Sequence, residues 1–249
     1  QPPRFVGLDN YEHFLSNDDR FFDAMFRTFL FTIGAVAVQL FLGLGIALLL
    51  HGKFPGQNII KTLILLPMVA TPVAIGMAWL LMYEPTIGVF NHLLRSFGMQ
   101  AQPWLGSQSQ ALICLIVVDV WQWTPMMTMI LLAGLTTLPE EPFEAARVDG
   151  AGSIQRFFYL VLPMLMPTIL TALLLRSIEA LKTFDIIYTM TRGGPGFATE
   201  TLNTYAYVLS FEYFRMGRAS SLLVIFFAIV LGVSLLFVQL RNIAEARRT

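Results

Sequence analysis

The sequence is poor in charge and almost free of cysteine. Charged residues make up 13% of its 249 residues, against roughly 25% in a typical soluble domain. The one cysteine, Cys114, lies within an apolar run, which excludes an internal disulfide framework and argues against a thiolate metal site. The histidines His13, His51 and His92 stand too far apart to form a metal-ligand motif. With a formal net charge of zero, nothing suggests a nucleic-acid partner.

Motifs of several function classes are also missing. The chain has no H-E-x-x-H, no G-x-S-x-G and no histidine within an apolar run, so an intramembrane enzyme would lack its reactive groups. It has no Walker A sequence and is not expected to hydrolyse ATP itself. A self-sufficient secondary carrier or channel is the alternative function, but such carriers usually show internal repeats, and none is visible here. The sequence shows no signal peptide and begins at Gln1, so we expect an N-terminal segment, such as a further transmembrane helix, to precede it.

What the sequence has in abundance is apolar length. Hydrophobic residues make up 56% of the chain, and its mean hydropathy is +0.66. A membrane-spanning helix needs about 20 apolar residues. We therefore predict an all-α integral membrane protein, a polytopic helical bundle with five visible spans. The runs are 29–50, 63–83, 111–135, 157–181 and 219–240.

Small residues recur every fourth position in the first two runs, which predicts faces where helices pack closely. In the first run, this stripe includes one polar residue: it consists of Ala35, Gln39, Gly43 and Ala47. In the second run, the stripe consists of Ala70, Ala74 and Ala78. Pro67 and Pro72 in the second run remove backbone donors, so a kink is expected there.

The third run carries Asp119 and Gln122, which share a helical face, beside Trp123. A carboxylate inside a span costs at least roughly 2–3 kcal/mol unless it faces the bundle interior or water. One interpretation is a structural hydrogen bond to a neighbouring helix. The other is a polar patch on a path for a hydroxyl-rich solute, with a tryptophan available to stack on a sugar ring.

Charges at three-residue spacing end the fourth run, where Arg176, Glu179 and Lys182 alternate in sign. We expect a ladder of ion pairs on one helical face, and a gate or solute contact is the alternative. The polar connection 184–218 that follows contains Gly193-Gly194-Pro195-Gly196. This is turn chemistry rather than a phosphate-binding loop, because no strand precedes it and no G-K-S/T follows.

A charged, glycine-broken segment, 144–167, separates two of the apolar runs. Thr137 is expected to cap a short amphipathic helix, with Pro139 in its first turn and Gly150 ending it in the left-handed region. Ser153 is expected to cap the helix that re-enters the membrane. We interpret this segment as a docking surface for a water-soluble partner. An ordinary solvated loop is the alternative.

The order of residues in this segment resembles a known signature. Glu144-Ala145-Ala146, Asp149-Gly150-Ala151-Gly152, Leu162-Pro163 and Pro167 are similar to the EAA motif of binding-protein-dependent ABC importer permeases, in its sugar-importer form. The F-x-G-L-x-N-Y pattern from Phe5 and the F-D-I-I-Y-T-M-T-R-G-G-P stretch from Phe184 resemble the maltose-type subunit of the permease pair. The resemblance covers nearly the whole chain.

The resemblance implies a type I importer permease that moves a sugar or related polyol through a path shared with a second, homologous permease. Two ATP-binding subunits would bind the ATP and magnesium, leaving no cofactor in this chain, and an extracytoplasmic solute-binding protein would deliver the solute. The ATPase contact would be Glu144, Ala145, Ala146, Asp149 and Gly150. The candidate path residues are Asp119, Gln122, Trp123, Gln39 and Glu179.

The implied location is the cytoplasmic membrane of a bacterium or archaeon. Residues 1–27 would form an extracytoplasmic lead-in, 28–241 the permease domain with its coupling loop at 137–155, and 242–249 a cytoplasmic tail. Basic residues support this orientation modestly, because they are denser in the segments placed in the cytoplasm. They are Lys53, Lys61, Arg147, Arg156, Arg241, Arg247 and Arg248.

Overall fold

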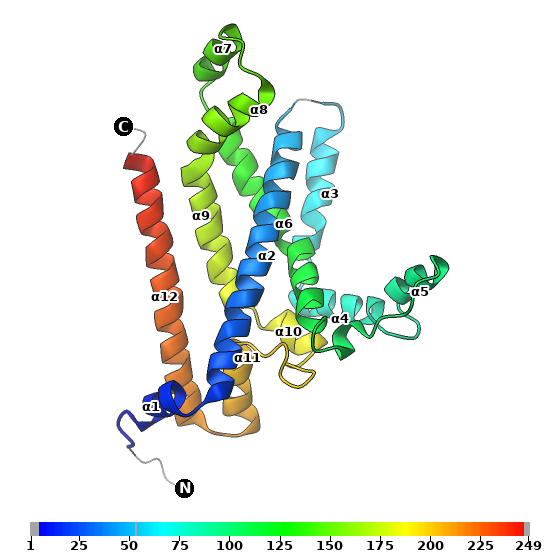
Figure 1. The fold of residues 1–249 in the computed structure, drawn as a ribbon, viewed down its shortest axis with the longest axis vertical. Coiled ribbons are helices and arrows are strands. Elements are labelled where there is room, and N and C mark those ends of the chain that lie inside the picture. The colour runs from blue at the N-terminus through cyan, green and yellow to red at the C-terminus, as the bar shows by residue number, and fades with distance from the viewer. Residues whose placement is uncertain (1–4, 53, 247–249) are drawn as a thin grey trace. The chain divides into compact units, whose positions relative to one another are not determined.

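The protein is seen in a computed structural model that describes residues 5–52 and 54–246 (Figure 1). All regular elements in these residues are helices, which confirms the predicted all-α class. Three parts of the sequence-based predictions lie outside the described residues. They are the first four residues of the lead-in, the basic residue Lys53, and residues 247–249 of the tail with Arg247 and Arg248.

Among the described residues, four continuous helical stretches are long and apolar enough to cross a membrane. They are α2 (Asp19–His51), α6 (Ala111–Thr136), the stretch Ser153–Leu181 and α12 (Met216–Ala246). A fifth crossing is possible if α3 (Gln57–Val69) and α4 (Pro72–Met82) form one bent span. These elements match the five predicted runs, although α2 begins at Asp19 rather than Phe29.

The predicted kink in the second run is a complete break of the helix. Pro67 is tolerated inside α3, and the helix then stops at Val69 and restarts at Pro72. Proline lacks the N–H that would continue the hydrogen-bond ladder, yet it fits the first turn of a new helix. The break therefore follows from Pro72.

Backbone contacts divide the chain into two compact units. Unit 1 comprises the described parts of Gln1–Ala35, Ala70–Asp119 and Glu179–Gly232. Unit 2 comprises those of Val36–Val69, Val120–Ile178 and Val233–Thr249. Several long helices therefore contribute residues to both units.

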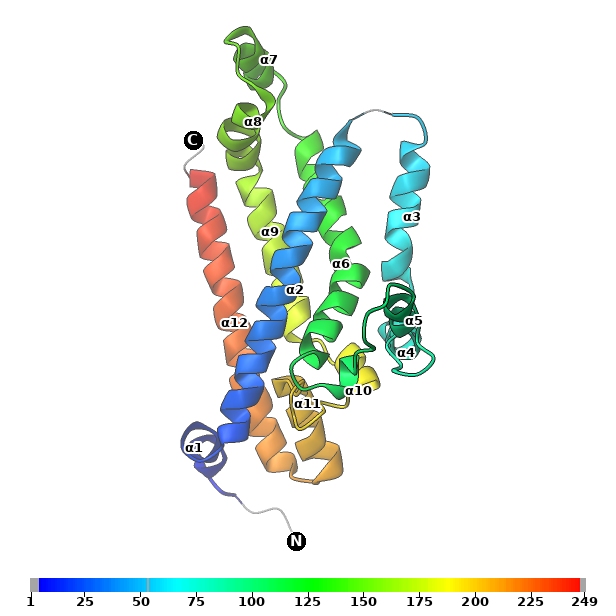
Figure 2. The ribbon, with the colours of Figure 1, turned by 45° about the vertical axis from the view of Figure 1, so that its right-hand side comes forward.

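Unit 1 has an aromatic and aliphatic core that includes Phe31, Tyr83 and Leu115. Within it, α10 packs against α4 (Figure 2). A Cβ on Gly76 would lie 3.3 Å from the Cβ of Thr189, so the two helices approach closely here. The shorter elements of this unit are α1 (Asp9–Ser16), α5 (Val89–Ser96), the 3₁₀ turn η1 (Trp104–Gly106), α10 (Asp185–Met190), α11 (Leu202–Tyr207) and the π-helical turn η3 (Val208–Glu212).

The two predicted packing stripes have different outcomes. In the first run, Ala35, Gln39 and Ala47 are fully buried, and a Cβ on Gly43 would lie 2.8 Å from Met127 Cγ. That prediction is confirmed. The second prediction is wrong for packing within the chain, because its three alanines are exposed and the face that packs holds Ile75 and Gly76. The second stripe is Ala70, Ala74 and Ala78.

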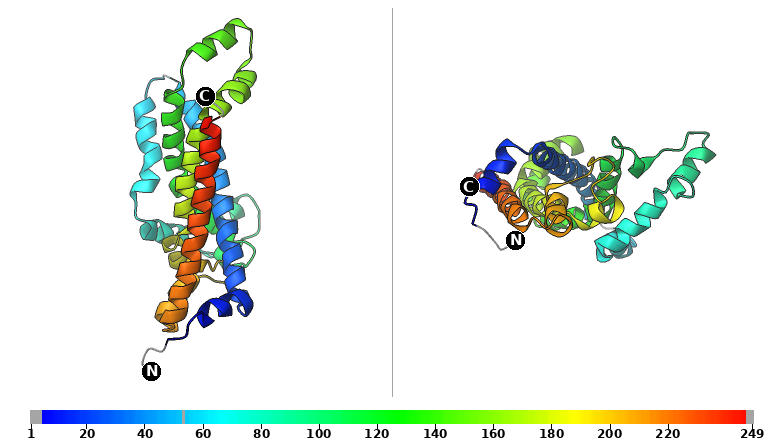
Figure 3. Two further views of the ribbon diagram at one scale, coloured as in Figure 1. Left: turned by 90° about the vertical axis from the view of Figure 1, so that its left-hand side faces the viewer. Right: turned by 90° about the horizontal axis from the view of Figure 1, so that it is seen from below.

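Unit 2 contains the charged segment between the third and fourth runs. It forms α7 (Glu141–Val148), α8 (Ser153–Arg156), the π-helical turn η2 (Phe157–Val161) and the beginning of α9 (Leu162–Leu181). Figure 3 shows α7 and α8 as separate short helices joined by a turn. Helices α6 and α9 pack closely in this unit, since a Cβ on Gly134 of α6 would lie 2.6 Å from Thr168 Cγ2 of α9.

Candidate functional site

The start of α7 differs from the sequence-based expectation. The Thr137 hydroxyl donates a hydrogen bond to the Gly134 carbonyl at 2.8 Å, so it closes the end of α6 and does not cap α7. The residue before α7 is Glu140, which makes no side-chain cap bond, and Pro142 occupies the first turn. The capping prediction for Thr137 and the placement of Pro139 in the first turn are therefore wrong. Glu141 and Glu144 still place negative charge in the first turn, where the helix dipole favours it.

The end of α7 is the predicted left-handed stop. Gly150 has φ +78°. The Gly150 N–H bonds to the Arg147 carbonyl at 3.1 Å, and the Ala151 N–H bonds to the Ala146 carbonyl at 2.9 Å. This pair of bonds is a Schellman motif, which satisfies the last carbonyls of the helix and reverses the chain.

The next helix starts one residue earlier than predicted. Gly152, not Ser153, is its N-terminal cap residue, and its N–H donates to Gln155 Oε1 at 2.9 Å. The Ser153 hydroxyl instead accepts a hydrogen bond from Arg156 Nη2 at 3.2 Å. A serine in the first turn of the helix can make such a side-chain bond without capping it.

A π-helical turn joins α8 to α9. The Leu162 N–H bonds to the Phe157 carbonyl, five residues back. Pro163 follows directly and has no N–H to continue the ordinary ladder, which accounts for the widened turn at this place. The helical path from Ser153 to Leu181 is nonetheless continuous, as predicted.

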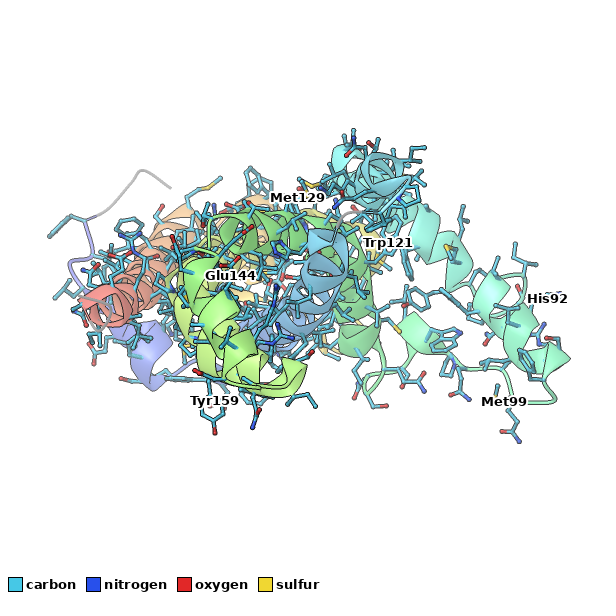
Figure 4. All side chains as sticks on the ribbon, turned by 90° about the horizontal axis from the view of Figure 1, so that it is seen from above. His92, Met99, Trp121, Met129, Glu144 and Tyr159 are labelled. Carbon is cyan, nitrogen blue, oxygen red and sulfur yellow. The ribbon has the colours of Figure 1, made fainter. Side chains whose placement is uncertain are left out.

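The α7 segment presents its characteristic side chains to the outside of unit 2. Glu144, Ala145, Asp149 and Gly150 are exposed, and Ala146 is half-buried. Large apolar side chains around them are exposed as well: Val148 is 89% exposed, Ile154 75% and Tyr159 79%. In Figure 4, Glu144 lies on α7 and Tyr159 points outward from the ribbon. Ile154 and Tyr159 belong to the apolar stretch Ser153–Leu181, whereas Val148 lies on the charged helix α7 itself, where an exposed apolar group suits a protein-binding surface.

Two hollows flank this segment. One of about 460 Å³ is lined by the inner side of the turn, including Ala146, Gly150 and Tyr159. The other, of about 790 Å³, lies between α7 and the ends of α2 and α6, and its wall includes His51, Glu144 and Arg147. Open space thus lies on both sides of α7, which suits an element that engages another molecule.

The candidate path residues are distributed over both units. In unit 2, Arg176 Nε donates to Gln39 Oε1 at 2.8 Å, and its guanidinium lies 5.4 Å from the ring centre of Trp123. Arg176 is only 1% exposed, so Gln39 and Trp123 contact a buried cation and help to stabilise its charge. Gln122 is also buried in this unit. This cluster joins residues that the sequence analysis had treated separately.

The remaining two path residues belong to unit 1. Asp119 is fully buried there. Glu179 forms an ion pair with Lys182 at 3.0 Å, and both side chains are half exposed. The Glu179–Lys182 step of the predicted charge ladder is therefore confirmed. Among the residues that the structure describes, no three His, Cys, Asp or Glu side chains could together hold a metal ion.

Comparison with known proteins decides the family. Residues 39–247 match the model of the binding-protein-dependent transport system inner membrane component. The chain belongs to this family. It is 42% identical over 230 residues to a probable ABC transporter permease protein, y4oQ, of Sinorhizobium fredii, covering 92% of this chain and 74% of that one. It is 37% identical over 238 residues to the trehalose/maltose transport system permease protein MalF of Thermococcus litoralis, covering 94% and 79%.

The fold of this permease agrees with the family. It matches a chain in the crystal structure of a bacterial ABC transporter involved in import of the acidic polysaccharide alginate. The TM-score is 0.86 at 20% identity, with coverage of 97% of this chain and 85% of that one. The predicted type I importer architecture and multi-pass membrane location are thereby confirmed.

The permease contains a buried ion pair that the sequence analysis missed. Arg20 donates to both carboxylate oxygens of Glu200, at 2.7 and 2.6 Å. The guanidinium also lies 4.2 Å from the ring centre of Phe197 and 4.6 Å from that of Tyr205. This pair fixes the Gly-Gly-Pro-Gly connection to the beginning of α2. The partners stand 180 residues apart, so no local spacing could have indicated the contact.

A row of four aromatic rings in unit 1 was also missed. Phe184 and Tyr188 stack at 5.1 Å, Tyr188 and Tyr207 lie 4.7 Å apart, and Tyr207 and Phe211 5.0 Å apart. A hydrogen bond with Tyr207 raises the pKa of Tyr188. The Phe184–Tyr188 and Tyr207–Phe211 pairs have the four-residue spacing of a helix, but Tyr188 and Tyr207 lie on different short helices, so their contact could not be predicted from local spacing.

Proposed function

We propose that this chain is one of two permease subunits of an ATP-driven importer for a sugar or related polyol. The observation that carries the proposal is α7, an exposed helix closed by the Gly150 turn and bordered by exposed Val148, Ile154 and Tyr159. Such a surface suits a cleft on a separate protein. The trehalose/maltose relative supports the solute class. Family membership disfavours a self-sufficient carrier.

The proposed partners are a second homologous permease, two ATP-binding subunits and an extracytoplasmic solute-binding protein. ATP hydrolysis, with its magnesium, belongs to the ATP-binding subunits, and this chain performs no catalysis. Glu144, Ala145, Ala146, Asp149 and Gly150 form the proposed ATPase contact. Division into an outer lead-in at 1–27, a permease domain at 28–241 and a cytoplasmic tail at 242–249 remains part of this proposal.

Movement of the ATPase subunits would reach the membrane through the backbone. The Gly150 turn leads through Ala151 and Gly152 directly into the continuous helical stretch of α8, η2 and α9, so displacement of α7 would pull on the start of α9. A connector of this kind can link two states of a transporter. Asp119, Gln122, Trp123, Gln39 and Glu179 are the proposed path residues, reached by a neutral, hydroxyl-rich solute.

Co-purification tests the ATPase contact. This chain would carry an affinity tag and be co-expressed with the genes of the second permease and the ATP-binding subunit. We expect Glu144→Lys to lose the ATP-binding subunit while retaining the second permease, because the charge reversal lies in the contact. Glu141→Lys makes the same charge change on the same helix and serves as the matched control. If Glu144→Lys retains the ATPase and full uptake, the proposed contact is wrong.

The solute class needs a separate measurement. Proteoliposomes of the whole transporter with its binding protein would be offered radiolabelled trehalose, maltose, glycerol and glycerol phosphate. We expect ATP-dependent uptake of a neutral sugar or polyol. Uptake that persists without any ATP-binding subunit would favour the self-sufficient carrier.

A further inference from the structure

One segment of unit 1 takes no part in the functions proposed so far. It runs from Glu84 to Trp104 and contains α5, and we call it the α5 arm. Its ends are tied to apolar helices, since α4 stops at Met82 and α6 starts at Ala111. By chain continuity, the arm therefore lies where these two helices reach the membrane surface.

Hydrogen bonds and close backbone packing stabilise the inner side of the arm. The Asn91 amide donates to the carbonyls of Pro85 and Gln102 at 3.0 and 2.8 Å, and its oxygen accepts from the Trp104 indole at 2.9 Å. Gly88 admits no side chain, because a Cβ would lie 2.2 Å from the Glu84 carbonyl oxygen. The arm is thus a folded element with a fixed outer face.

The outer face of α5 is divided lengthwise into two strips. Val89, Leu93 and Phe97 follow one another at four-residue spacing, and all are exposed. His92 and Ser96, also exposed, form a polar strip beside them. Figure 4 marks His92 on α5 and Met99 beyond its end. Helices with an apolar strip along a polar one lie in the plane of a membrane surface.

Two further observations point to lipid as the covering partner. Where the arm meets α4, the rings of Trp79, Tyr83, Phe90 and Trp104 form one cluster with centroid separations of 4.9–6.1 Å. Tryptophan and tyrosine gather at the level of lipid headgroups. In addition, no Asp or Glu occurs between Pro85 and Val118, so no acidic group within the arm after Glu84 repels anionic headgroups.

The charged side chains of the arm, those of Glu84 and Arg95, are compatible with a phospholipid surface. The Glu84 carboxylate accepts hydrogen bonds from the backbone of Thr86 and Ile87 and is thereby held inside the turn. These bonds lower its pKa, the bond from Ile87 most strongly. Arg95 donates to the carbonyls of Pro85 and Thr86, on the polar side of the helix. Its cation is available to lipid phosphate.

We infer that the α5 arm is an interfacial anchor whose apolar strip, Val89, Leu93 and Phe97, lies among the headgroups and upper acyl chains of the bilayer. Its partner is the phospholipid surface at the end of the membrane where α6 begins. The preceding helix α4 also exposes apolar side chains, those of Val73, Met77 and Leu81.

Spin-label accessibility in nanodiscs tests the anchor on the complete transporter. Single cysteines at Val89, Leu93 and Phe97 would carry nitroxides, with His92 as the matched control on the same helix. The native Cys114 is buried and should label little. We expect the nitroxides on the apolar strip to collide several-fold more often with oxygen than with a water-soluble nickel chelate, and the nitroxide at His92 to show the reverse.

Each other result overturns the inference. Equal exposure of all four labels to the nickel chelate would place the arm in water. Loss of both collisions at the apolar strip would show that protein, such as the second permease or the binding protein, covers it. The measurement needs neither uptake nor ATPase activity, so its failure is distinguishable from failure of the proposed importer function.

Discussion

At the scale of single residues, the buried guanidinium of Arg176 carries a clear energetic requirement. A buried cation needs full compensation, and Gln39 provides a hydrogen bond to it at 2.8 Å. Hydrogen bonds to charged groups are worth about 1.5–3 kcal/mol. Gln39 therefore contributes to stability as well as to the proposed solute path.

Replacement of Gln39 separates these contributions. We expect Gln39→Leu to lower the thermal stability of the detergent-purified transporter, by about 2 kcal/mol, because the acceptor for Arg176 is lost. Gln39→Glu keeps an acceptor oxygen and should retain most of the stability. Melting curves followed by size-exclusion fluorescence provide the measurement. Equal melting temperatures for Gln39→Leu and the parent chain would contradict the assigned role.

Asp119 offers a second residue-scale test, this time of the path. We expect Asp119→Asn to change the apparent KM for the solute while the subunit still assembles, because the amide has nearly the same shape without the charge. Uptake assays and co-purification would be carried out on the same preparations. If the variant does not assemble, Asp119 has a structural role, as its complete burial also permits.

At the scale of elements, the apolar runs were predictable and their ends were less so. Long hydrophobic stretches determine which segments cross the membrane, and left-handed Gly150 was readable because glycine alone adopts that conformation without strain. The caps were not readable. Thr137 lies within reach of the last turn of α6, and this neighbouring carbonyl competes with the role predicted for it.

The elements of the connection 184–218 escaped prediction for a different reason. Its turn residues are genuine, but α10 and α11 are each only six residues long, too short for a periodic signal. They are stabilised by contacts far away in sequence. The Leu202 N–H, for example, donates to the Thr28 hydroxyl at 2.9 Å.

The Gly150 turn provides a test at this scale. A Cβ at this position would meet no atom of this chain within 4 Å, so within the chain a substitution acts through the backbone. Gly150→Ala should strain the turn by about 1–2 kcal/mol and reduce uptake per ATP hydrolysed. Gly150→Asn should be closer to the parent, since asparagine tolerates left-handed φ. If both variants behave alike, the Schellman turn is not needed for coupling.

At the scale of the whole molecule, family membership and a modest bias of basic residues support the same orientation. The proposed arrangement places 51–62 and 136–156 in the cytoplasm and the α5 arm outside. Because a topology is set by all spans together, one incorrectly assigned run would invert every later loop. The lone cysteine, buried in α6, makes this arrangement easy to examine.

Orientation can be read by cysteine labelling. We expect Gln100→Cys to react with a membrane-impermeant maleimide in intact cells, and Asn58→Cys to react only in inside-out vesicles. Both positions are exposed. The parent chain, with Cys114 alone, measures the background. The opposite pattern would invert the proposed topology.

The π-helical turn between α8 and α9 also sets an angular phase. Each residue of an α-helix advances the direction of its side chain by about 100°, and a π turn accommodates one residue more than an α turn. Removing a single residue from Phe157–Val161 would restore ordinary winding and leave the flanking helices in phase, whereas rewinding the same residues as an α-helix would turn the α7–α8 segment about the axis of α9 by roughly that angle. Glu144 and its neighbours would then face a different direction in the cytoplasm, with every side chain of the docking surface intact. The direction in which the proposed docking surface faces thus depends on the winding of this turn as well as on residue identity.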